Sequence, residues 1–314
     1  MRGKGLRYLL LKFSLVFVLC LMFALGGLAQ NVSLPPVNLG LTAFLDGVAG
    51  PGAFAEQYFE YYDGFQFNNK NGNKIPGKNS LESFSTITHI AYITKLKLLG
   101  GYYGFEMLLP IANIDLDMEG GPKDKKTGFG DVCISPFLLQ WTDSKLFGRP
   151  FFHRFALGIN VPTGKYNKNN DINPGSNLYS FNSYYAFTMF ITPKLTTSWR
   201  LSYLWNSENN NPNKMFNANN IQPGQAFHVN YALSYEFLNK LRVGLAGYYL
   251  KQFTPDTVGG NAVTGSMESS FALGPGILFK LNKIDVHINS YFEIATRNRP
   301  EGNKIVIHLS KVFL

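Results

Sequence analysis

The chain has 314 residues, and its 29 lysines and arginines outnumber its 20 acidic residues, which gives a formal net charge of +9. Four of the basic residues lie within the first 12 positions; without them 25 basic residues face 20 acidic ones, a surplus of +5 that forms no cluster. This distribution excludes the concentrated basic patch of a nucleic-acid-binding protein.

Residues 1–29 have the pattern of a cleaved secretory signal peptide. A positively charged start without acidic residues is followed by the apolar run Phe13–Leu25, and Gly27 and Ala29 place small residues at positions −3 and −1 of a cleavage site. We therefore predict cleavage after Ala29. An uncleaved anchor is the alternative, but this run is shorter than the roughly 20 residues of a membrane-spanning helix. Cys133 is then the one remaining cysteine, so no intrachain disulfide is expected.

Residues 30–56 are expected to form a periplasmic leader or a plug segment ahead of the first strand. Part of this segment is apolar and punctuated by proline and glycine, a composition that favours packing against the rest of the chain over a disordered leader. The candidate plug residues are Leu39, Leu41, Phe44, Leu45 and Asp46.

From residue 57 to residue 314 the sequence alternates with the period of two that is typical of β-strands. In the stretch 195–205, for example, Leu195, Trp199 and Tyr203 share one face, while Ser198 and Arg200 share the other. We predict about twelve strands of this kind, near residues 57–67, 82–95, 101–112, 129–142, 150–161, 180–191, 194–205, 225–237, 240–252, 268–280, 284–295 and 303–313.

Such strands form either a soluble sandwich with its apolar faces inward or a membrane barrel with its apolar faces outward. The barrel is favoured because the strands are long, because aromatic residues lie near the ends of the apolar faces, and because short and long connections alternate. We therefore predict an all-β fold, a transmembrane antiparallel up-and-down barrel with long external loops and short periplasmic turns. Pro136 and Pro275 fall inside predicted strands, where each removes a ladder donor, so they mark either bulges or wrong strand boundaries. The stretch 84–95 alternates poorly.

The polar faces of these strands carry charged and titratable side chains that would line the lumen. They form either a ladder of salt bridges that fills a narrow barrel or a polar path that sorts solutes by charge. The candidate lumen-lining residues are Glu106, Arg154, Arg200, His228, Glu236, Arg242, Asp285, His287, Glu293 and His308.

No motif indicates a cofactor, a metal site or a catalytic centre. The lumen histidines lie on different strands without a local ligand pair, and the stretch 167–173 resembles a calcium loop but holds one carboxylate. Ser198, Ser202, Ser234 and Ser270 would face the lumen, but the sequence pairs none of them with a base, as a hydrolase requires.

A set of short motifs gives the chain a resemblance to a known family. In order they are Gly128-Phe-Gly-Asp131, Pro162-Thr-Gly-Lys-Tyr166, Asn173-Pro-Gly-Ser-Asn177, Gly224-Gln-Ala-Phe-His228, Gly247-Tyr-Tyr-Leu-Lys-Gln252 and Leu273-Gly-Pro-Gly276. The chain resembles the transporter-like outer-membrane family involved in the meta-pathway of phenol degradation. The resemblance implies movement of hydrophobic or aromatic compounds across the outer membrane, and it supplies no catalytic residues.

The expected function is therefore a non-enzymatic barrel in the bacterial outer membrane that passes small hydrophobic or aromatic compounds. The expected partners are outer-membrane lipid, such a solute and the barrel-assembly machinery. The alternatives are a sealed barrel that is structural or presents its loops, an outer-membrane hydrolase, and a soluble periplasmic β-protein. The solute, the direction of transport, the state of the lumen and the oligomeric state stay open.

Overall fold

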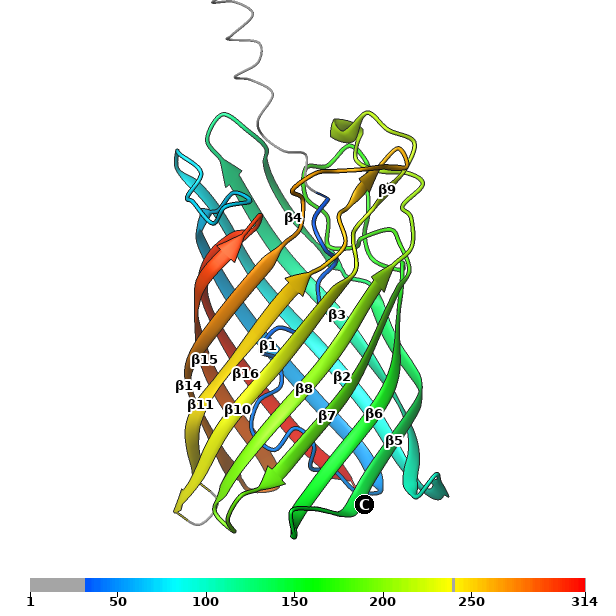
Figure 1. The fold of residues 1–314 in the computed structure, drawn as a ribbon, viewed down its shortest axis with the longest axis vertical. Coiled ribbons are helices and arrows are strands. Elements are labelled where there is room, and N and C mark those ends of the chain that lie inside the picture. The colour runs from blue at the N-terminus through cyan, green and yellow to red at the C-terminus, as the bar shows by residue number, and fades with distance from the viewer. Residues whose placement is uncertain (1–31, 239–240, 314) are drawn as a thin grey trace, which may run out of the picture. The chain divides into compact units, whose positions relative to one another are not determined.

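The computed structural model describes residues 32–238 and 241–313, and in it twelve antiparallel strands close into one barrel (Figure 1). Closure is complete because β1 pairs with β2 on one side and with β16 on the other. The twelve barrel strands are β1 (Gly52–Phe67), β2 (Asn79–Leu98), β3 (Gly101–Met118), β5 (Val132–Leu146), β6 (Arg149–Val161), β7 (Ser180–Phe190), β8 (Leu195–Asn206), β10 (Ala226–Leu238), β11 (Leu241–Gln252), β14 (Ser269–Leu281), β15 (Ile284–Arg297) and β16 (Pro300–Phe313).

The predicted twelve-stranded antiparallel barrel is confirmed. The signal peptide predicted for residues 1–29 lies outside the described residues. No helix within the described part of the chain is long and apolar enough to cross a membrane.

Two predicted boundaries are wrong. Strand β1 begins at Gly52 instead of residue 57, because residues 53–56 already pair with both neighbouring strands. The expected loop 114–128 is largely a hairpin, in which β4 (Lys123–Phe129) pairs with the end of β3. The glycine, proline and lysine content of this stretch predicted a loop, but its two strands pair and carry cross-strand ion pairs, with Lys125 Nζ 2.7 Å from Asp115 Oδ2.

The two prolines lie where the strand ladder is interrupted. Pro136 falls at a register shift between Ile134 and Phe137 in the pairing of β5 with β6. Pro275 falls in a gap in the pairing of β14 with β15, between Leu273 and Gly276. Because the strand pairing is already interrupted in both places, the missing N–H group of each proline costs few hydrogen bonds between strands.

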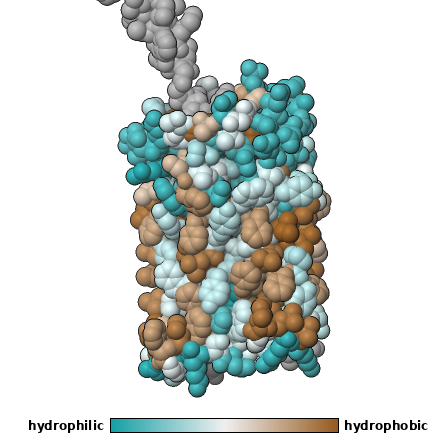
Figure 2. Space-filling view, turned by 45° about the vertical axis from the view of Figure 1, so that its right-hand side comes forward, coloured by the Kyte–Doolittle hydropathy of each residue, from teal (hydrophilic) through white to brown (hydrophobic). Residues whose placement is uncertain are grey.

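The alternation of side chains gives the barrel an apolar exterior and a polar interior. On β10, Leu233 is 49% exposed and Tyr235 is 45% exposed, whereas the intervening Ser234 is 2% exposed. Figure 2 shows apolar side chains gathered over the strands, with polar side chains at the loop end and along the opposite edge. The strands therefore face lipid instead of water, and closure of the barrel leaves no strand edge without hydrogen-bond partners.

One end of the barrel carries tight turns and the other carries long loops (Figure 1). At the turn end, Leu99-Gly100 and Phe147-Gly148 have φ values of 50° and 79°, and of 51° and 75°, which matches two-residue hairpins. The long loops contain the short helix η1 (Lys214–Phe216) and a small sheet of β9 (Ile221–Gln222), β12 (Thr257–Val258) and β13 (Asn261–Ala262). The connection between β15 and β16 is an exception at the loop end, with only residues 298–299.

The lipid-facing role of Leu233 predicts a specific loss of stability. Leu233→Arg places a charge against hydrocarbon near the middle of β10 and should lower the free energy of unfolding by about 2–4 kcal/mol. Urea unfolding of the protein in lipid vesicles measures this change. Asn219→Arg, in an exposed loop, is the control and should stay within about 0.5 kcal/mol of the parent. Equal effects of the two substitutions would contradict the lipid-facing assignment.

Candidate functional site in the barrel lumen

Residues 32–51, hereafter the lumen segment, run inside the barrel from the loop end to the turn end, where β1 begins (Figure 1). At the loop end, the backbone N–H of Leu34 donates to Glu268 Oε1 at 3.1 Å. Toward the turn end, Gly47 N–H donates to Thr188 Oγ1 at 2.9 Å, and Gln140 Nε2 donates to the carbonyl of Gly47 at 3.0 Å. The candidate plug residues therefore all lie in the lumen.

Wall side chains satisfy the backbone of this irregular segment. Gly40 N–H donates to Asn230 Oδ1 at 3.0 Å, and its carbonyl accepts from Tyr291 OH at 2.8 Å. Lys304 Nζ donates to the carbonyl of Leu39 at 3.0 Å. A chain without secondary structure leaves its amides unpaired, so these polar wall residues make the buried path of the segment tolerable.

Asp46 joins the lumen segment to two wall arginines. Its Oδ1 lies 3.1 Å from an Arg154 guanidinium nitrogen and 2.6 Å from one of Arg200, and its Oδ2 accepts from Arg200 Nε at 2.8 Å. Arg154 and Arg200 both lie in register with Ala186 of the intervening strand β7. The two arginines thus sit two strand spacings apart, about 10 Å at the backbone, and the small Ala186 leaves room for the carboxylate between them.

Tyr184 of β7 completes this ion-pair group. Its ring lies beneath the Arg200 guanidinium at 3.8 Å, and its hydroxyl accepts from Arg154 Nε at 3.1 Å. The same hydroxyl donates to Glu106 Oε1 at 2.9 Å. The group therefore extends from the lumen segment to β3.

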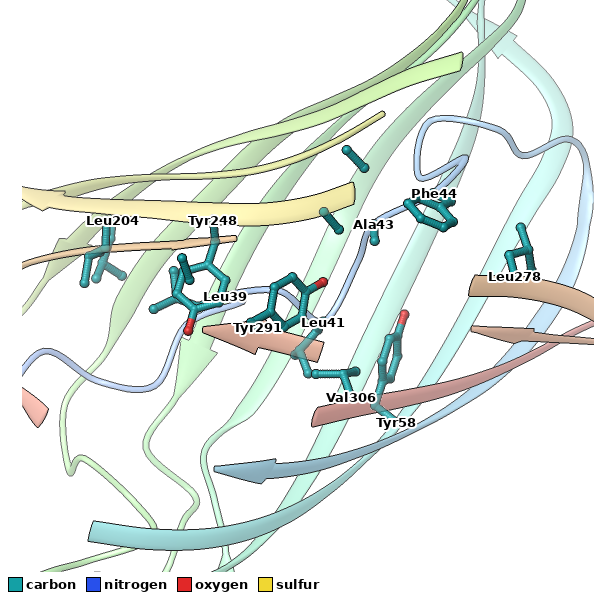
Figure 3. Close-up of a cluster of buried hydrophobic side chains, with 14 of the residues drawn as sticks. Leu39, Leu41, Ala43, Phe44, Tyr58, Leu204, Tyr248, Leu278, Tyr291 and Val306 are labelled. Carbon is teal, nitrogen blue, oxygen red and sulfur yellow. The ribbon is translucent and has the colours of Figure 1, made fainter. Parts of the chain in front are cut away.

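The apolar residues of the lumen segment form the second type of contact with the wall. Leu39, Leu41 and Phe44 are 5%, 8% and 2% exposed. They belong to one buried cluster with wall residues (Figure 3). The larger wall members of that cluster are Tyr58, Leu204, Tyr248, Leu250, Leu278, Tyr291 and Val306. Leu45 packs at the edge of the cluster with a φ of 59°.

Glu106 also belongs to a titratable cluster that contains His89 and Glu56, two residues that the sequence did not reveal. His89 lies between two carboxylates, with Nδ1 2.5 Å from Glu56 Oε2 and Nε2 3.1 Å from Glu106 Oε2. Sequence reasoning missed His89 because its stretch of β2 alternates poorly, and it missed Glu56 because the predicted strand started one residue later. Glu56 lies in the first part of β1, which precedes the predicted start of the strand at residue 57. Extending the predicted strand by one residue would have included Glu56.

The remaining candidate lumen residues separate into two groups, of which the first is buried. Glu293 accepts from Tyr62 OH at 2.7 Å and from Tyr248 OH at 3.0 Å. His228 contacts Asn182 Oδ1 at 3.0 Å. The rings of His287 and His308 stack with centroids 4.7 Å apart.

The second group lies at the turn-end rim, away from the lumen segment. Arg242 pairs with Glu236 at 3.1 Å, and Lys280 pairs with Asp285 at 3.2 Å. Each pair joins neighbouring strands, and the side chains of Glu236 and Asp285 are both 37% exposed. These pairs fit the salt-bridge ladder better than a solute path.

Among the described residues, these clusters form neither a metal site nor a complete catalytic triad. In residues 32–238 and 241–313, no group of three histidine, cysteine or acidic side chains could hold a metal ion. Ser144 Oγ lies 3.0 Å from His153 Nε2, but His153 stacks on Trp141 and its Nδ1 has no hydrogen-bond partner within that part of the chain. The pair therefore lacks the third group that orients a catalytic base.

Together, the closed barrel, its apolar exterior and its occupied lumen define an outer-membrane β-barrel. The model of the family described as "Putative MetA-pathway of phenol degradation" matches residues 64–309, and the chain belongs to this family. This match confirms the resemblance inferred from the sequence.

Solved structures show what this fold is similar to. The COG4313 outer membrane channel from Pseudomonas putida F1 superposes with a TM-score of 0.77 at 15% identity, covering 88% of this chain and 100% of that one. The transport unit of the autotransporter AIDA-I from Escherichia coli gives a TM-score of 0.51 at 8% identity, covering 88% and 94% of the two chains. No curated protein matches the sequence. At such low identity these likenesses show the fold alone.

Removing the charge of Asp46 should destabilise the closed lumen. Asp46→Asn leaves two largely buried guanidiniums without a carboxylate and should lower the free energy of unfolding by about 3–5 kcal/mol. Urea unfolding in detergent micelles measures the loss. Asp285→Asn removes an acid from the exposed rim pair and should cost no more than about 1 kcal/mol. A loss for Asp46→Asn as small as that of the control would show that the two arginines do not depend on Asp46.

The buried side chain of Glu268 at the loop end predicts that the stability of the folded protein depends on pH. Burial raises the pKa of Glu268 to about 7 from its ordinary 4.5, against the opposing charge of Arg299. The folded protein therefore binds this proton more tightly than the unfolded chain, so stability should fall as the pH rises from 4.5 to about 7. Unfolding curves should show a shallower fall over this range for Glu268→Gln. Parallel profiles for the two proteins would contradict the burial of a titrating Glu268.

Proposed function

We propose that this barrel passes small hydrophobic or aromatic compounds across the outer membrane through its lumen, and that the lumen segment is a movable plug. The observation that carries the proposal is the apolar cluster between the segment and the wall. Leu39, Leu41 and Phe44 bury their side chains against wall tyrosines and aliphatic residues in the interior of a membrane barrel. An apolar solute that reaches the lumen can replace these contacts, whereas a sugar or an ion cannot.

The size of the barrel supports this kind of solute. A barrel of about twelve strands is narrower than the 16- to 18-stranded barrels that hold a wide aqueous channel. The lumen segment fills much of the space that remains, with hydrogen bonds and ion pairs on several strands. Passage therefore requires the segment to move, and a solute that binds the displaced state better shifts the population toward it.

A reversible cross-link tests this mechanism. The backbone nitrogen of Leu45 lies 3.0 Å from Ser198 Oγ, so these two positions are in contact, and a disulfide between cysteines placed there would fix the segment to β8. In a Cys133→Ser background, oxidised Leu45→Cys/Ser198→Cys protein in vesicles with a lipopolysaccharide outer leaflet, which apolar solutes cross poorly, should lose uptake of radiolabelled toluene, and reduction should restore it. The two single-cysteine variants are the controls and should take up toluene in both redox conditions. Undiminished uptake by the cross-linked protein would refute a moving segment.

The filled lumen also favours a second candidate, a sealed barrel that is structural or presents its loops. Shallow depressions of about 490 and 430 Å³ lie among the loops, and Asn217–Asn220 and Leu178-Tyr179 line them in part. The uptake assay separates the two candidates, because a sealed barrel gives vesicles no more toluene than empty vesicles take up. Insertion by the barrel-assembly machinery is common to both candidates.

A further inference from the structure

The ring of Phe44 reaches the barrel wall at a point where β14 has no side chain. Phe44 is 2% exposed, and a β-carbon added to Gly276 would lie 2.8 Å from its Cζ, the para carbon of the ring. Leu278, the next inward position on β14, belongs to the same apolar cluster, and Figure 3 shows Phe44 projecting from the lumen segment. Gly276, Leu278 and Asn289 are hereafter the Phe44 seat, a recess of the wall that takes one six-membered ring.

Asn289 gives this seat an unused polar group. It pairs in register with Gly276 and is 1% exposed. Its Oδ1 has no hydrogen-bond partner in the described part of the chain, and the added β-carbon of Gly276 would lie 2.2 Å from it. The unpaired acceptor and the para carbon of Phe44 both lie beside the backbone of Gly276 and are therefore within 5.0 Å of each other. A buried polar atom without a partner is rare in a folded protein and calls for an explanation.

We propose that the Phe44 seat is a ligand site of the lumen for a monocyclic phenol, and that Phe44 is its resident occupant. This inference rests on the proposed function and names its solute class. A phenol ring in the position of the Phe44 ring carries its hydroxyl group toward Asn289 Oδ1 and donates to it. Benzene fills the same volume but leaves Asn289 unpaired, so the seat distinguishes a phenol from a hydrocarbon.

The position of Phe44 links ligand binding to movement of the lumen segment. Phe44 and a phenol cannot occupy the seat together, so a bound phenol stabilises the state in which Phe44 has left. Phe44 lies two residues from Asp46 in the sequence, so its departure strains the ion pairs with Arg154 and Arg200. The seat is thus the place where a solute acts on the plug.

A double-mutant cycle tests the geometry without any ligand. Phe44→Tyr adds the hydroxyl group that the seat is inferred to accept, and it should leave the urea midpoint unchanged or raise it. In an Asn289→Leu background the same substitution buries an unpaired hydroxyl group and should lower the midpoint. A lower midpoint for Phe44→Tyr in both backgrounds would overturn the inference.

Ligand binding tests the site directly. Full-length Phe44→Ala in lipid nanodiscs should bind phenol, measured by calorimetry, and Phe44→Ala/Asn289→Leu should bind phenol about tenfold more weakly with unchanged affinity for benzene. Leu41→Ala opens a space in the same apolar cluster without removing Phe44 from its seat, so it is the matched control and should show no response to Asn289→Leu. An equal phenol affinity with and without Asn289 would overturn the inference.

These outcomes are distinguishable from failure of the proposed function. If toluene uptake depends on the lumen segment but the affinity for phenol is the same with and without Asn289, the Phe44 seat is rejected and the proposed transport function stands. Phenol binding that requires Asn289, in a barrel that takes up neither compound, supports the seat and rejects transport.

Discussion

The closed state of this barrel depends on the carboxylate of Asp46. Arg154 and Arg200 point into the lumen at the same level of the wall, and the acid that contacts both comes from the lumen segment. Without Asp46, two guanidiniums would remain in a largely buried space, a far less favourable arrangement than the paired one. The ion pairs therefore favour the filled lumen, and water that enters a displaced state can solvate the arginines again. The ion pairs are therefore strong in a lumen without water and weak in a hydrated one, which is the property that the proposed movable plug needs.

The apolar cluster responds to water in the opposite way from the ion pairs of Asp46. Leu39, Leu41 and Phe44 gain from leaving water, and they would lose that gain whenever the segment moves into an aqueous lumen. A hydrophobic solute can cover the wall residues that the segment leaves, so it offsets part of the loss. Under the proposed function, water can release the polar contact and an apolar solute can replace the apolar contact, so the barrel would be closed to water and would pass apolar compounds.

Most of the fold follows from the sequence because a membrane barrel imposes a period of two on every strand. The alternation indicated which side chains face the barrel interior: Arg200, His228 and Glu293 are buried there, and Arg154 is partly buried. The hairpin of β3 and β4 was predicted as a loop, because glycine, proline and lysine are frequent in it and most side chains of β4 are polar on both faces. Alternation thus predicts a strand only where one face meets lipid.

The contacts in the lumen could not be predicted in the same way. Asp46 is 108 residues from Arg154 and 154 residues from Arg200, and no local pattern relates them. Their meeting depends on the register of β6, β7 and β8, which sets both arginines beside Ala186. His89 was missed for a related reason, since an uneven stretch of β2 concealed its inward position. A single sequence gives the inward side of a strand but not the partner across the lumen.

Hydrogen exchange of the lumen segment tests the central claim most directly. In protein embedded in nanodiscs, backbone amides of residues 39–47 should be protected from exchange, since wall side chains and the buried cluster cover them. A saturating aromatic solute should raise their exchange rate by at least about tenfold while the amides of the barrel strands stay protected. Unchanged protection of residues 39–47 under conditions in which the solute crosses the membrane would contradict the account, because the solute would then pass without displacing the segment.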